Sequence, residues 1–590
     1  MYLLGVSCFY HDSAAVLLED GIIVAAAEEE RFSRVKHDND FPEKSIQFCL
    51  RQANIEVEDL DYVVFYEKPL VKFERILSTS LGTFPQSWRS FSEAMITWFD
   101  EKLWVKSLLQ REIGIEPKKI LFCEHHLSHA ASAFLASPYE EAAILTIDGV
   151  GEWTTATMGY GNASWEQGGE NEIVLTHEQR FPHSLGLLYS AFTAFLGFRV
   201  NSGEYKVMGM APYGEPRYLE KINQVFKVYE DGSFWTDMDY FSYHYSVEHT
   251  FSRKFVDLFG EPRIPESEFF TTMTDPGVSS DNPSVRENQY YADVAASIQR
   301  FTEETILGMA NALYRTTGSK RLCMAGGVAL NSKANGRILK ETPFEELFIQ
   351  PAAGDSGGAL GAALYAYHVW LGKPRGFVQE HNFWGKEYSD LEVRTLLEKN
   401  GIQFEEMGSA QLIDRVVDDL VEGKVVGWFQ GRFEWGPRAL GNRSILADPR
   451  KAEMKDIVNK KIKFREPFRP FAPVLPEHII EDYFDFEIEG LSYPARYMQV
   501  VEPIREEKQE VIPAVNHLGT GRLQTVRREW NPRYFDVIER FGEATGVPVL
   551  MNTSFNLRGE PIVSSPENAW NTFSNSGIDT LVLNNFLVKK

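Results

Sequence analysis

The segment Glu124–Ala133, EHHLSHAASA, places three histidines within five positions of a chain that has only 13 histidines in 590 residues. His125 and His129 are four residues apart, so on a helix both imidazoles share one face and could bind one cation. The zincin motif H-E-x-x-H is absent, because His126 stands where its glutamate would be. The pair therefore predicts either a metal site or two histidines that only pack within a helix.

Two imidazoles leave a metal site incomplete, so carboxylates must join them from elsewhere. Asp148 ends an apolar strand in AILTIDGVGE, and Asp355 lies in FIQPAAGDSGGALGAA. A carboxylate on a glycine-rich turn at the carboxyl end of a strand lies at the mouth of an α/β cleft. These two residues are the candidates to complete the site, whereas His126 lies on another face of the predicted helix.

Glycine-rich turns indicate a second kind of site. CMAGGVALNSKANG (323–336) predicts a strand, a Gly-Gly turn and a helix from Ala329, and main-chain N–H groups at such a helix start bind phosphate. Neither the P-loop nor the dinucleotide pattern is present, and glycine pairs also serve helix packing. Their co-occurrence with IDGVGE and SCFYHDSA favours an ATP cleft of the actin/Hsp70/sugar-kinase type. The candidate nucleotide-binding residues are Gly149, Glu204, Lys206, Gly326, Gly327 and Asn331.

One segment departs from the acidic character of the chain, whose net charge is −24. From Gln430 to Pro470 there are eleven Lys and Arg against five Asp and Glu. Many of these cations are arginines set among glycine, proline and aromatic residues, which favours a shaped anion site over a solvated basic face. The overall charge argues against nucleic acid as a partner.

Two similar strand-turn-strand units must position these residues. We predict strands at Leu3–Cys8, Ala14–Leu18 and Ile22–Ala27, with a turn at Glu19–Gly21, and again at Ala142–Gly149 and Trp153–Tyr160. Two such units, each leading into helices, predict a duplicated α/β ATPase fold. Residues 67–115 read as helical, with Trp88, Phe91, Trp98 and Trp104 expected in core or interdomain packing, or alternatively on a substrate wall.

The remaining pattern divides the chain in two. An irregular insertion over 214–283 precedes a helix over 288–316 and a strand over 321–325. A boundary fits at 372–376, and a second α/β domain follows, with a helix over 390–400 and a strand over 425–429. We therefore predict domains at 1–375 and 376–590, consistent with a chain too long for one core.

The composition predicts the cellular compartment of the protein. The four cysteines are scattered and lack C-x-x-C spacing, which favours a cytoplasmic protein without disulfides or a cysteine zinc site. No apolar stretch approaches the length of a membrane span, so no membrane association is expected. The N-terminus reads as a buried first strand and not as a signal peptide.

Ten segments in chain order resemble the O-carbamoyltransferases of antibiotic and nodulation-factor biosynthesis. They are GVSCFYHDSAAVLLEDG, EEERFSRVKHDNDFP, EHHLSHAASAF, LTIDGVGEW, NSGEYKVMGMAPYG, GGVALN, GDSGGALGAA, EWGPRALGNRSILADPR, REPFRPFAPVLPE and MNTSFNLRGEPIV. The resemblance implies an actin-like N-terminal domain of the tRNA threonylcarbamoyl-transferase type and a YrdC-like C-terminal domain. The C-terminal domain would join carbamoyl phosphate to ATP, releasing pyrophosphate and forming carbamoyl adenylate. The N-terminal domain would pass the carbamoyl group to a hydroxyl of a small molecule and release AMP.

The resemblance also implies site residues. His125, His129, Asp148 and Asp355 would bind a divalent metal, most often iron. Carbamoyl phosphate and ATP would bind in the second domain at Arg438, Arg443, Ser444, Lys463, Arg465, Arg469, Arg522, Asn552, Ser554 and Asn556. Lys36 and His11 would contact nucleotide or acceptor, and His11 and Asp12 are candidate bases.

The chemistry makes sense of these residue types. Carbamoyl phosphate and ATP bring several negative charges together, and attack at the α-phosphorus requires that arginine forks, lysine and Mg²⁺ screen them. In the first domain a Lewis-acid metal could hold the adenylate phosphate and polarise the carbamoyl carbonyl. The acceptor itself, sugar or other natural product, has no signature in the sequence.

Other functions fit less well. A tRNA-modifying enzyme that makes threonylcarbamoyladenosine is the main alternative, but the net charge and the lack of a basic stripe count against it. Cysteine carbamoylation for hydrogenase maturation would require paired zinc-finger cysteines that the chain lacks. A non-enzymatic ATP-binding scaffold leaves the His/Asp and Arg-rich motifs unexplained. A homodimer is the default expectation for the oligomeric state.

Overall fold

The computed structural model describes residues 1–100, 102–275, 277–485 and 489–590. These residues group into two compact units. Unit 1 comprises residues 1–11, 15–22 and 55–378, and unit 2 comprises residues 12–14, 23–54 and 379–590. The main division falls after Val378, and an N-terminal stretch groups with the last third of the chain. No helix in the described ranges combines the length and the apolar run that a membrane span needs.

The N-terminal strands confirm the predicted strand-turn-strand pattern. They are β1 (Tyr2–Ser7), β2 (Ala14–Glu19) and β3 (Ile22–Glu28). Asp20 and Gly21 in the turn have φ of 49° and 82°, as a type I′ hairpin requires. The sheet has the order β3-β2-β1-β4-β5, in which β4 is Leu60–Phe65 and β5 is Ile120–Phe122. β1, β4 and β5 run parallel.

A second sheet repeats that order. Its strands are β6 (Glu141–Ile147), β7 (Thr154–Ala163), β8 (Asn171–Arg180), β11 (Arg321–Ala325) and β12 (Glu346–Ile349). The order β12-β11-β6-β7-β8 is again fifth, fourth, first, second, third, with β6, β7 and β8 antiparallel and β6, β11 and β12 parallel. The repeat confirms the duplicated α/β ATPase fold. β8 was not predicted, because a largely exposed edge strand shows little apolar alternation.

Helices connect the strands. The predicted helical stretch contains α3 (Pro69–Gly82), α4 (Trp88–Asp100) and α5 (Val105–Ile113), and Glu101 within it lies outside the described residues. Of its tryptophans only Trp98 is buried. Trp88 and Trp104 are 61% and 57% exposed, so the prediction that they pack in a core was wrong. The helix expected over 288–316 is α11 (Pro283–Thr317), which Asn282 caps.

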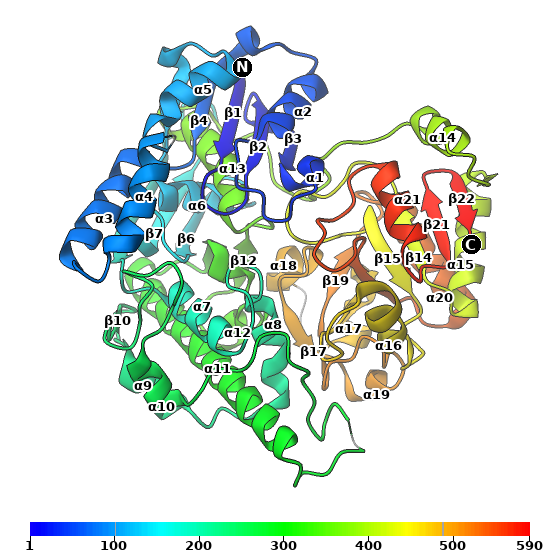
Figure 1. Cartoon of the computed structure of the whole chain (residues 1–590). Helices are drawn as coiled ribbons and strands as arrows, with labels where there is room; N and C mark the ends of the chain where they lie inside the picture. The colour runs from blue at the N-terminus through cyan, green and yellow to red at the C-terminus, as the bar shows by residue number, and fades with distance from the viewer. Residues whose placement is uncertain (101, 276, 486–488) are drawn as a thin grey trace. The chain divides into compact units, whose positions relative to one another are not determined.

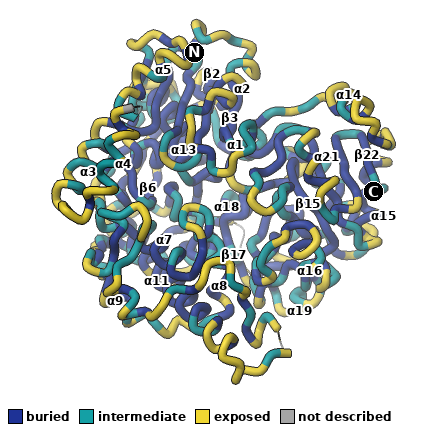
Figure 2. Tube along the Cα trace, viewed as in Figure 1, coloured by how far each residue is buried: buried dark blue, intermediate teal, exposed yellow. Residues whose placement is uncertain are grey.

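The region expected to be irregular, 214–283, holds short elements, and Pro276 in it lies outside the described residues. They are α9 (Leu219–Val225), β9 (Phe226–Val228), β10 (Phe234–Thr236) and α10 (Arg253–Phe259). Figure 2 shows the labelled strands β6 and β15 as buried, whereas α3 and α9 carry exposed stretches.

Two helices occupy equivalent places after the fifth strand of each sheet. They are α6 (His125–Phe134) and α13 (Asp355–Tyr365), and they pack against one another. α13 also packs on β1 (Figure 1). Glycine permits this approach, because a Cβ at Gly5 would stand 1.9 Å from the carbonyl oxygen of Ala359. Gly361 of GDSGGALGAA serves the packing of α13 on α6 in the same way, because a Cβ there would meet the main chain of Ser128.

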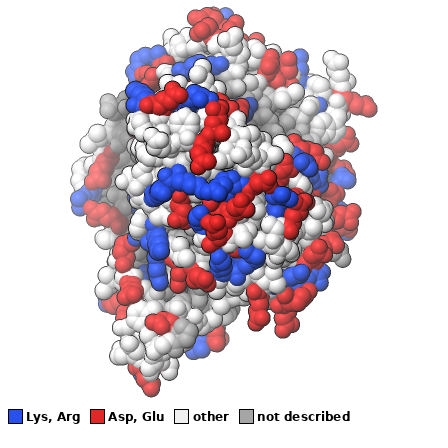
Figure 3. All heavy atoms as spheres, turned by 90° about the vertical axis from the view of Figure 1, so that its right-hand side faces the viewer, with Lys and Arg blue, Asp and Glu red and all other residues white. Residues whose placement is uncertain are grey.

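Unit 2 is built on an eight-stranded sheet in the order β13-β22-β21-β14-β15-β20-β16-β19. Its first three and last two strands are β13 (Glu405–Glu406), β22 (Phe586–Lys589), β21 (Thr580–Leu583), β16 (Ala472–Pro476) and β19 (Gln524–Val526). The strands that carry predicted site residues are β15 (Arg443–Ala447) and β20 (Leu550–Ser554), which pair antiparallel. α15 (Ser409–Glu422) and α20 (Pro532–Thr545) pack together, and their apolar faces share a core with Trp428 of β14 (Val426–Phe429). Figure 3 shows acidic and basic side chains mixed over the face it draws.

Candidate metal and anion sites

The structure brings His125, His129, Asp148 and Asp355 together in unit 1. One ligand atom from each lies within 4.8 Å of the others, and all four side chains are buried. The histidines stand one turn apart on α6, Asp148 directly follows β6, and Asp355 is the first residue of α13. The two equivalent helices of the duplicated fold thus supply three of the four groups.

The contacts within the cluster are short. Nε2 of His125 lies 3.1 Å from Nε2 of His129 and 3.2 Å from Oδ2 of Asp148. Oδ1 of Asp355 lies 3.7 Å from Nε2 of His125 and 3.8 Å from Nε2 of His129. The nitrogen and oxygen atoms therefore converge on one small volume.

Burial and mutual charge shape the protonation of the cluster. Burial lowers the pKa of His125, but its hydrogen bond with Asp148 and the Asp355 carboxylate raise that pKa to about 9. Burial and then the His125 charge lower the pKa of His129 to about 3. Burial raises the pKa of Asp355 to about 6, with Asp148 adding to the effect and His125 opposing it. The carboxylates therefore favour one cationic imidazole, and a metal that binds Nε2 of His125 would displace the proton there.

Main-chain and carboxylate contacts hold the cluster in place. Oδ1 of Asp148 accepts the N–H of Gly327 at 2.9 Å. Glu152 accepts the N–H of His125 at 3.0 and 3.1 Å, at the start of α6. Oε2 of Glu67 lies 3.8 Å from Nδ1 of His125, which is beyond hydrogen-bond distance but close enough for a favourable charge interaction. Glu67 and Glu152 were not predicted as site residues. For Glu152, its place four residues after Asp148 in DGVGEW is a sequence feature that could have indicated it.

The donor set fits a divalent metal. Two imidazole nitrogens and two carboxylates are a mixed set that zinc and iron accept. Oδ2 of Asp355 is buried without a hydrogen-bond partner among the described residues, an unfavourable state that a cation beside the carboxylate would relieve. His126 takes no part, since its Nδ1 bonds Oγ1 of Thr146 at 2.7 Å.

The predicted nucleotide residues of unit 1 have varied contacts. Glu204 begins α8 (Glu204–Met210), and its carboxylate accepts the N–H groups of Asn201 and Gly203 just before that helix. Lys206 lies over the ring of Phe198. The remaining four have main-chain or capping contacts: Gly149 accepts from Ser184, Gly326 donates to the carbonyl oxygen of Ala353, Gly327 donates to Asp148, and Asn331 caps α12 (Ser332–Glu341). α12 begins at Ser332, three residues after the predicted start, because residues 327–330 form a 3-10 turn.

The candidate bases lie on the loop after β1. Nε2 of His11 bonds the carbonyl oxygen of Asn201 at 2.8 Å, and the His11 charge lowers the pKa of Asp355, so the ring stands close to the cluster. Oδ1 of Asp12 bonds Nδ1 of His37 at 2.9 Å within unit 2. Lys36 is exposed in that same unit.

A second cluster forms around Lys463 in unit 2. Its Nζ donates to Oδ1 of Asn556 at 2.8 Å and to Oγ of Ser554 at 3.2 Å, and also to the main-chain oxygens of both residues. Burial lowers the pKa of Lys463 well below its usual value, and the charges of Arg465, Arg469 and Lys36 lower it further. Cations that depress one another's pKa in this way attract an anion.

Other predicted anion-binding residues lie in the same unit, and Ser444 is the one that pairs with a member of this cluster. Ser444 on β15 faces Ser554 on β20, and the Ser444 hydroxyl accepts the N–H of Gly441. Nδ2 of Asn552 donates to Oε1 of Gln524 at 2.6 Å. Arg438 and Arg522 belong to the same unit and are half-buried.

Arg443 has a different role from the predicted one. Its guanidinium is fully buried and donates to the main-chain oxygens of Gln430, Asn442 and Gly431 at 2.6, 2.8 and 3.1 Å. It also stacks on Phe429 at 3.5 Å, and burial lowers its pKa to about 10. An arginine bonded in this way holds the loop together and has little left to bind phosphate, so we exclude it from the anion site.

The segment after β3 organises a loop of unit 2, a role that no sequence pattern indicates. Oε1 of Glu28 accepts the N–H of Gly436 at 2.6 Å, and Arg31 donates to the carbonyl oxygen of Gly436 at 2.6 Å. Arg34 donates to the carbonyl oxygen of Ile562 at 2.7 Å. The loop that carries Arg438 is thus fixed by residues some four hundred positions earlier.

Comparison with known proteins places the chain in a family. The family described as "Carbamoyltransferase N-terminus" matches residues 2–364, and "Carbamoyltransferase C-terminus" matches residues 417–590. The uncharacterized protein sll1178 of Synechocystis sp. is 45% identical over 625 positions, covering 100% of this chain and 97% of its own. Nodulation protein NolNO of Sinorhizobium fredii is 38% identical, over 99% of this chain and 79% of its own.

Solved structures share less sequence. Component A of the Acidaminococcus fermentans (R)-2-hydroxyglutaryl-CoA dehydratase is 17% identical with a TM-score of 0.30, over 62% of this chain and 98% of its own. Full-length HypF in its phosphate- and nucleotide-bound form is 18% identical with a TM-score of 0.23. The match covers 32% of this chain and 23% of its own. The two family matches together span most of the sequence, and on them this chain belongs to the carbamoyltransferase family and is a transferase.

Proposed function

We propose that this protein is an ATP-dependent O-carbamoyltransferase that makes carbamoyl adenylate and passes the carbamoyl group to a hydroxyl of a small molecule. Its family supports the identity of the transferred group. The observation that carries the proposal is the convergence of two histidines and two aspartates in unit 1. A separate group of cations around Lys463 in unit 2 supplies a second site for an anionic donor.

The first reaction would take place in the C-terminal, YrdC-like domain, which we assign to residues 376–590. Carbamoyl adenylate keeps only one of the phosphorus atoms of ATP and carbamoyl phosphate, so pyrophosphate and inorganic phosphate must both leave. Water cleaves carbamoyl phosphate to carbamate and phosphate, and a carbamate oxygen then displaces pyrophosphate from the α-phosphorus. Lys463, Arg465 and Arg469, with Mg²⁺ on ATP, would screen the phosphates during this attack.

The transfer reaction would take place in the domain at 1–375. His125, His129, Asp148 and Asp355 would hold a divalent metal, iron by resemblance, which would supply Lewis-acid polarisation. The chain's own contacts keep these groups aimed inward: Gly327 fixes the Asp148 carboxylate, and Glu152 fixes the first turn of α6. The main chain at Gly326 and Gly327 lies where the adenylate would reach the cluster.

In the transfer step the acceptor oxygen forms a bond to the carbamoyl carbon, and the bond from that carbon to the phosphate oxygen breaks as AMP leaves. The hydroxyl proton goes to a base, for which we propose His11. Because Nε2 of His11 donates to a carbonyl oxygen, Nδ1 is the ring atom that takes a proton in the neutral tautomer. Asp12 and Lys36 are assigned supporting contacts to acceptor or nucleotide.

The test is to incubate the purified protein with ATP, carbamoyl phosphate, Mg²⁺ and ferrous iron. We expect pyrophosphate, inorganic phosphate and carbamoyl adenylate, detected by mass spectrometry, before any acceptor is added. Omission of carbamoyl phosphate is the control, and it should abolish pyrophosphate release. If neither pyrophosphate nor the adenylate forms, the proposed function is wrong.

A further inference from the structure

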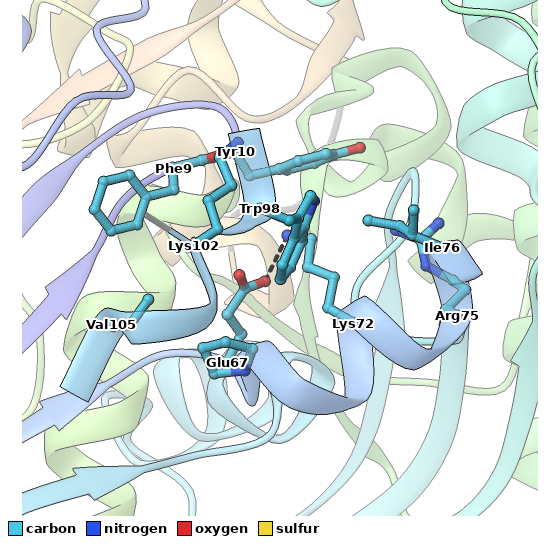
Figure 4. Close-up of a pocket in the computed structure, with 10 residues that line it drawn as sticks. Phe9, Tyr10, Glu67, Lys72, Arg75, Ile76, Trp98, Lys102 and Val105 are labelled. Carbon is cyan, nitrogen blue, oxygen red and sulfur yellow. Dashed lines mark hydrogen bonds and ion pairs between the residues drawn. The ribbon is translucent and has the colours of Figure 1, made fainter. Parts of the chain in front are cut away.

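A cavity of about 200 Å³ lies in unit 1 beside the metal-ligand cluster. Its walls come from the loop after β1, from α3 with Glu67 just before it, and from Trp98 of α4, Lys102 and Val105 of α5 (Figure 4). The lining residues that matter here are Tyr10, Glu67, Lys72, Arg75, Trp98 and Lys102. Glu67 joins the cavity to the cluster, because its carboxylate lies 3.8 Å from Nδ1 of His125. A molecule in this cavity would therefore have one end near the proposed site of transfer.

The cavity has aromatic walls and three cations. Tyr10 and Trp98 supply rings, and Figure 4 shows both beside the side chain of Lys72. Aromatic faces favour a ring-bearing ligand. Drug-sized ligands occupy about 300–1,000 Å³, so this smaller space suits a ligand with a single ring.

Two of the three cations already have partners. Nζ of Lys72 forms a buried ion pair with Glu67 at 2.7 Å and lies 4.2 Å from the centre of the Tyr10 ring. Nζ of Lys102 donates to the carbonyl oxygen of Phe9 at 2.8 Å. Neither lysine therefore needs a ligand to complete its contacts.

Arg75 lacks such a partner. Its side chain lines the cavity, is only 7% exposed, and forms no ion pair with any carboxylate in the described part of the chain. Its Nε is buried without a hydrogen-bond acceptor, and its one ring contact is with Phe181 at 4.9 Å. The charges of Glu67 and Glu152 also act on Arg75, but the first pairs with Lys72 and the second caps α6.

A buried cation without a counter-ion is unfavourable for folding. A chain that keeps such an arginine on the wall of a cavity gains if the ligand supplies the missing negative charge, since guanidinium binds carboxylate or phosphate oxygens through paired N–H donors. The cation–π contact with Phe181 alone offsets little of the cost. We therefore infer that the ligand carries the negative charge that no described residue supplies to Arg75.

We propose that this cavity binds the acceptor, and that the acceptor is a single-ring alcohol carrying an anionic group that pairs with Arg75. The ring lies against Tyr10 and Trp98, and the hydroxyl points to the metal-ligand cluster. This inference rests on the proposed function, because it takes the cluster to be the site of transfer.

Two matched probes test the charge requirement. 4-(Hydroxymethyl)benzoate carries a ring, a primary hydroxyl and a carboxylate, and its methyl ester differs only in lacking the charge. By isothermal titration of the wild-type protein we expect the carboxylate to bind roughly tenfold more tightly than the ester, as a charge-assisted pair should. Arg75→Gln should remove this preference, and Arg75→Lys should keep part of it. Lys106→Gln, an exposed substitution of equal charge change outside the cavity, is the control.

Equal binding of the two probes to the wild-type protein overturns the proposal, and so does a preference that survives in Arg75→Gln. Failure of both probes to bind at millimolar concentration also overturns it. The wild-type comparison does not depend on whether the variants fold. Pyrophosphate release without acceptor tests the proposed function separately, so a positive result there with no probe preference refutes the anionic acceptor alone.

Discussion

Gly361 of α13 lies directly against the main chain of Ser128 on α6, so that a Cβ at Gly361 would stand 1.7 Å from the Ser128 carbonyl oxygen. These helices carry Asp355, His125 and His129, and their spacing sets the distance between the carboxylate and the imidazoles. A glycine inside a helix therefore determines the geometry of the candidate metal site.

Gly361→Ala should force the two helices apart. We expect a loss of about 1–3 kcal/mol of unfolding free energy, as for other overpacked cores, together with weaker metal retention. Gly308→Ala is the matched control, because nothing lies within 4 Å of a Cβ there and α11 should gain about 0.5–1 kcal/mol. Thermal unfolding and metal analysis measure both effects. Unchanged stability in Gly361→Ala would show that the helices can separate freely.

The four clustered side chains should each be needed to hold a metal. His125→Ala, His129→Ala and Asp355→Asn should lower bound metal at least tenfold after dialysis, because each removes one donor from a small set. His126→Gln is the control, since His126 bonds Thr146 and not the cluster. Plasma mass spectrometry of the purified proteins gives the metal content. Full metal content in His125→Ala would exclude it as a ligand.

The two proposed reactions should separate by mutation. Arg469→Ala should abolish pyrophosphate release by removing a cation beside Lys463. His129→Ala should release pyrophosphate and accumulate carbamoyl adenylate, because only transfer needs the cluster. Stopped assays with and without acceptor separate the two activities. Loss of both reactions in His129→Ala would contradict this division between the domains.

Acid should destabilise unit 1 through His368. Burial lowers the pKa of this nearly inaccessible imidazole to about 4, so the unfolded state binds its proton first as the pH falls. The loss of unfolding free energy that His368 causes is negligible above about pH 6.5. It grows to about 3 kcal/mol as the pH falls toward 4. Urea unfolding at pH 7 and pH 5 should show about 2 kcal/mol less acid destabilisation in His368→Asn than in the wild type. Exposed His177→Asn is the control, and equal pH sensitivity in all three proteins would refute the role of His368.

Local patterns predicted much of the fold correctly. β1, β2 and β3 and the helices between 67 and 115 follow from periodicity within a few residues, which short stretches of chain can specify. β8 was missed because it is an exposed edge, and Trp88 and Trp104 were misplaced because an aromatic residue carries no signal of which helix face is covered.

The contacts that each predicted residue makes could be found only from the tertiary structure. Arg443 and Arg469 look alike in the sequence, yet the first bonds main-chain carbonyl oxygens and the second adds to the positive charge around Lys463. Likewise Arg75 is one arginine among many until the structure shows it buried on a cavity wall with no acidic partner among the described residues.

The sequence by itself determined that His125 and His129 share a helix face, since a four-residue spacing matches the helical repeat. It also determined that Asp148 ends a strand. Only the tertiary structure decided that Asp355 joins them, because α6 and α13 come from separate halves of the chain and meet where Gly361 lets their main chains touch. Contacts of that kind depend on packing between distant segments, which no local spacing encodes.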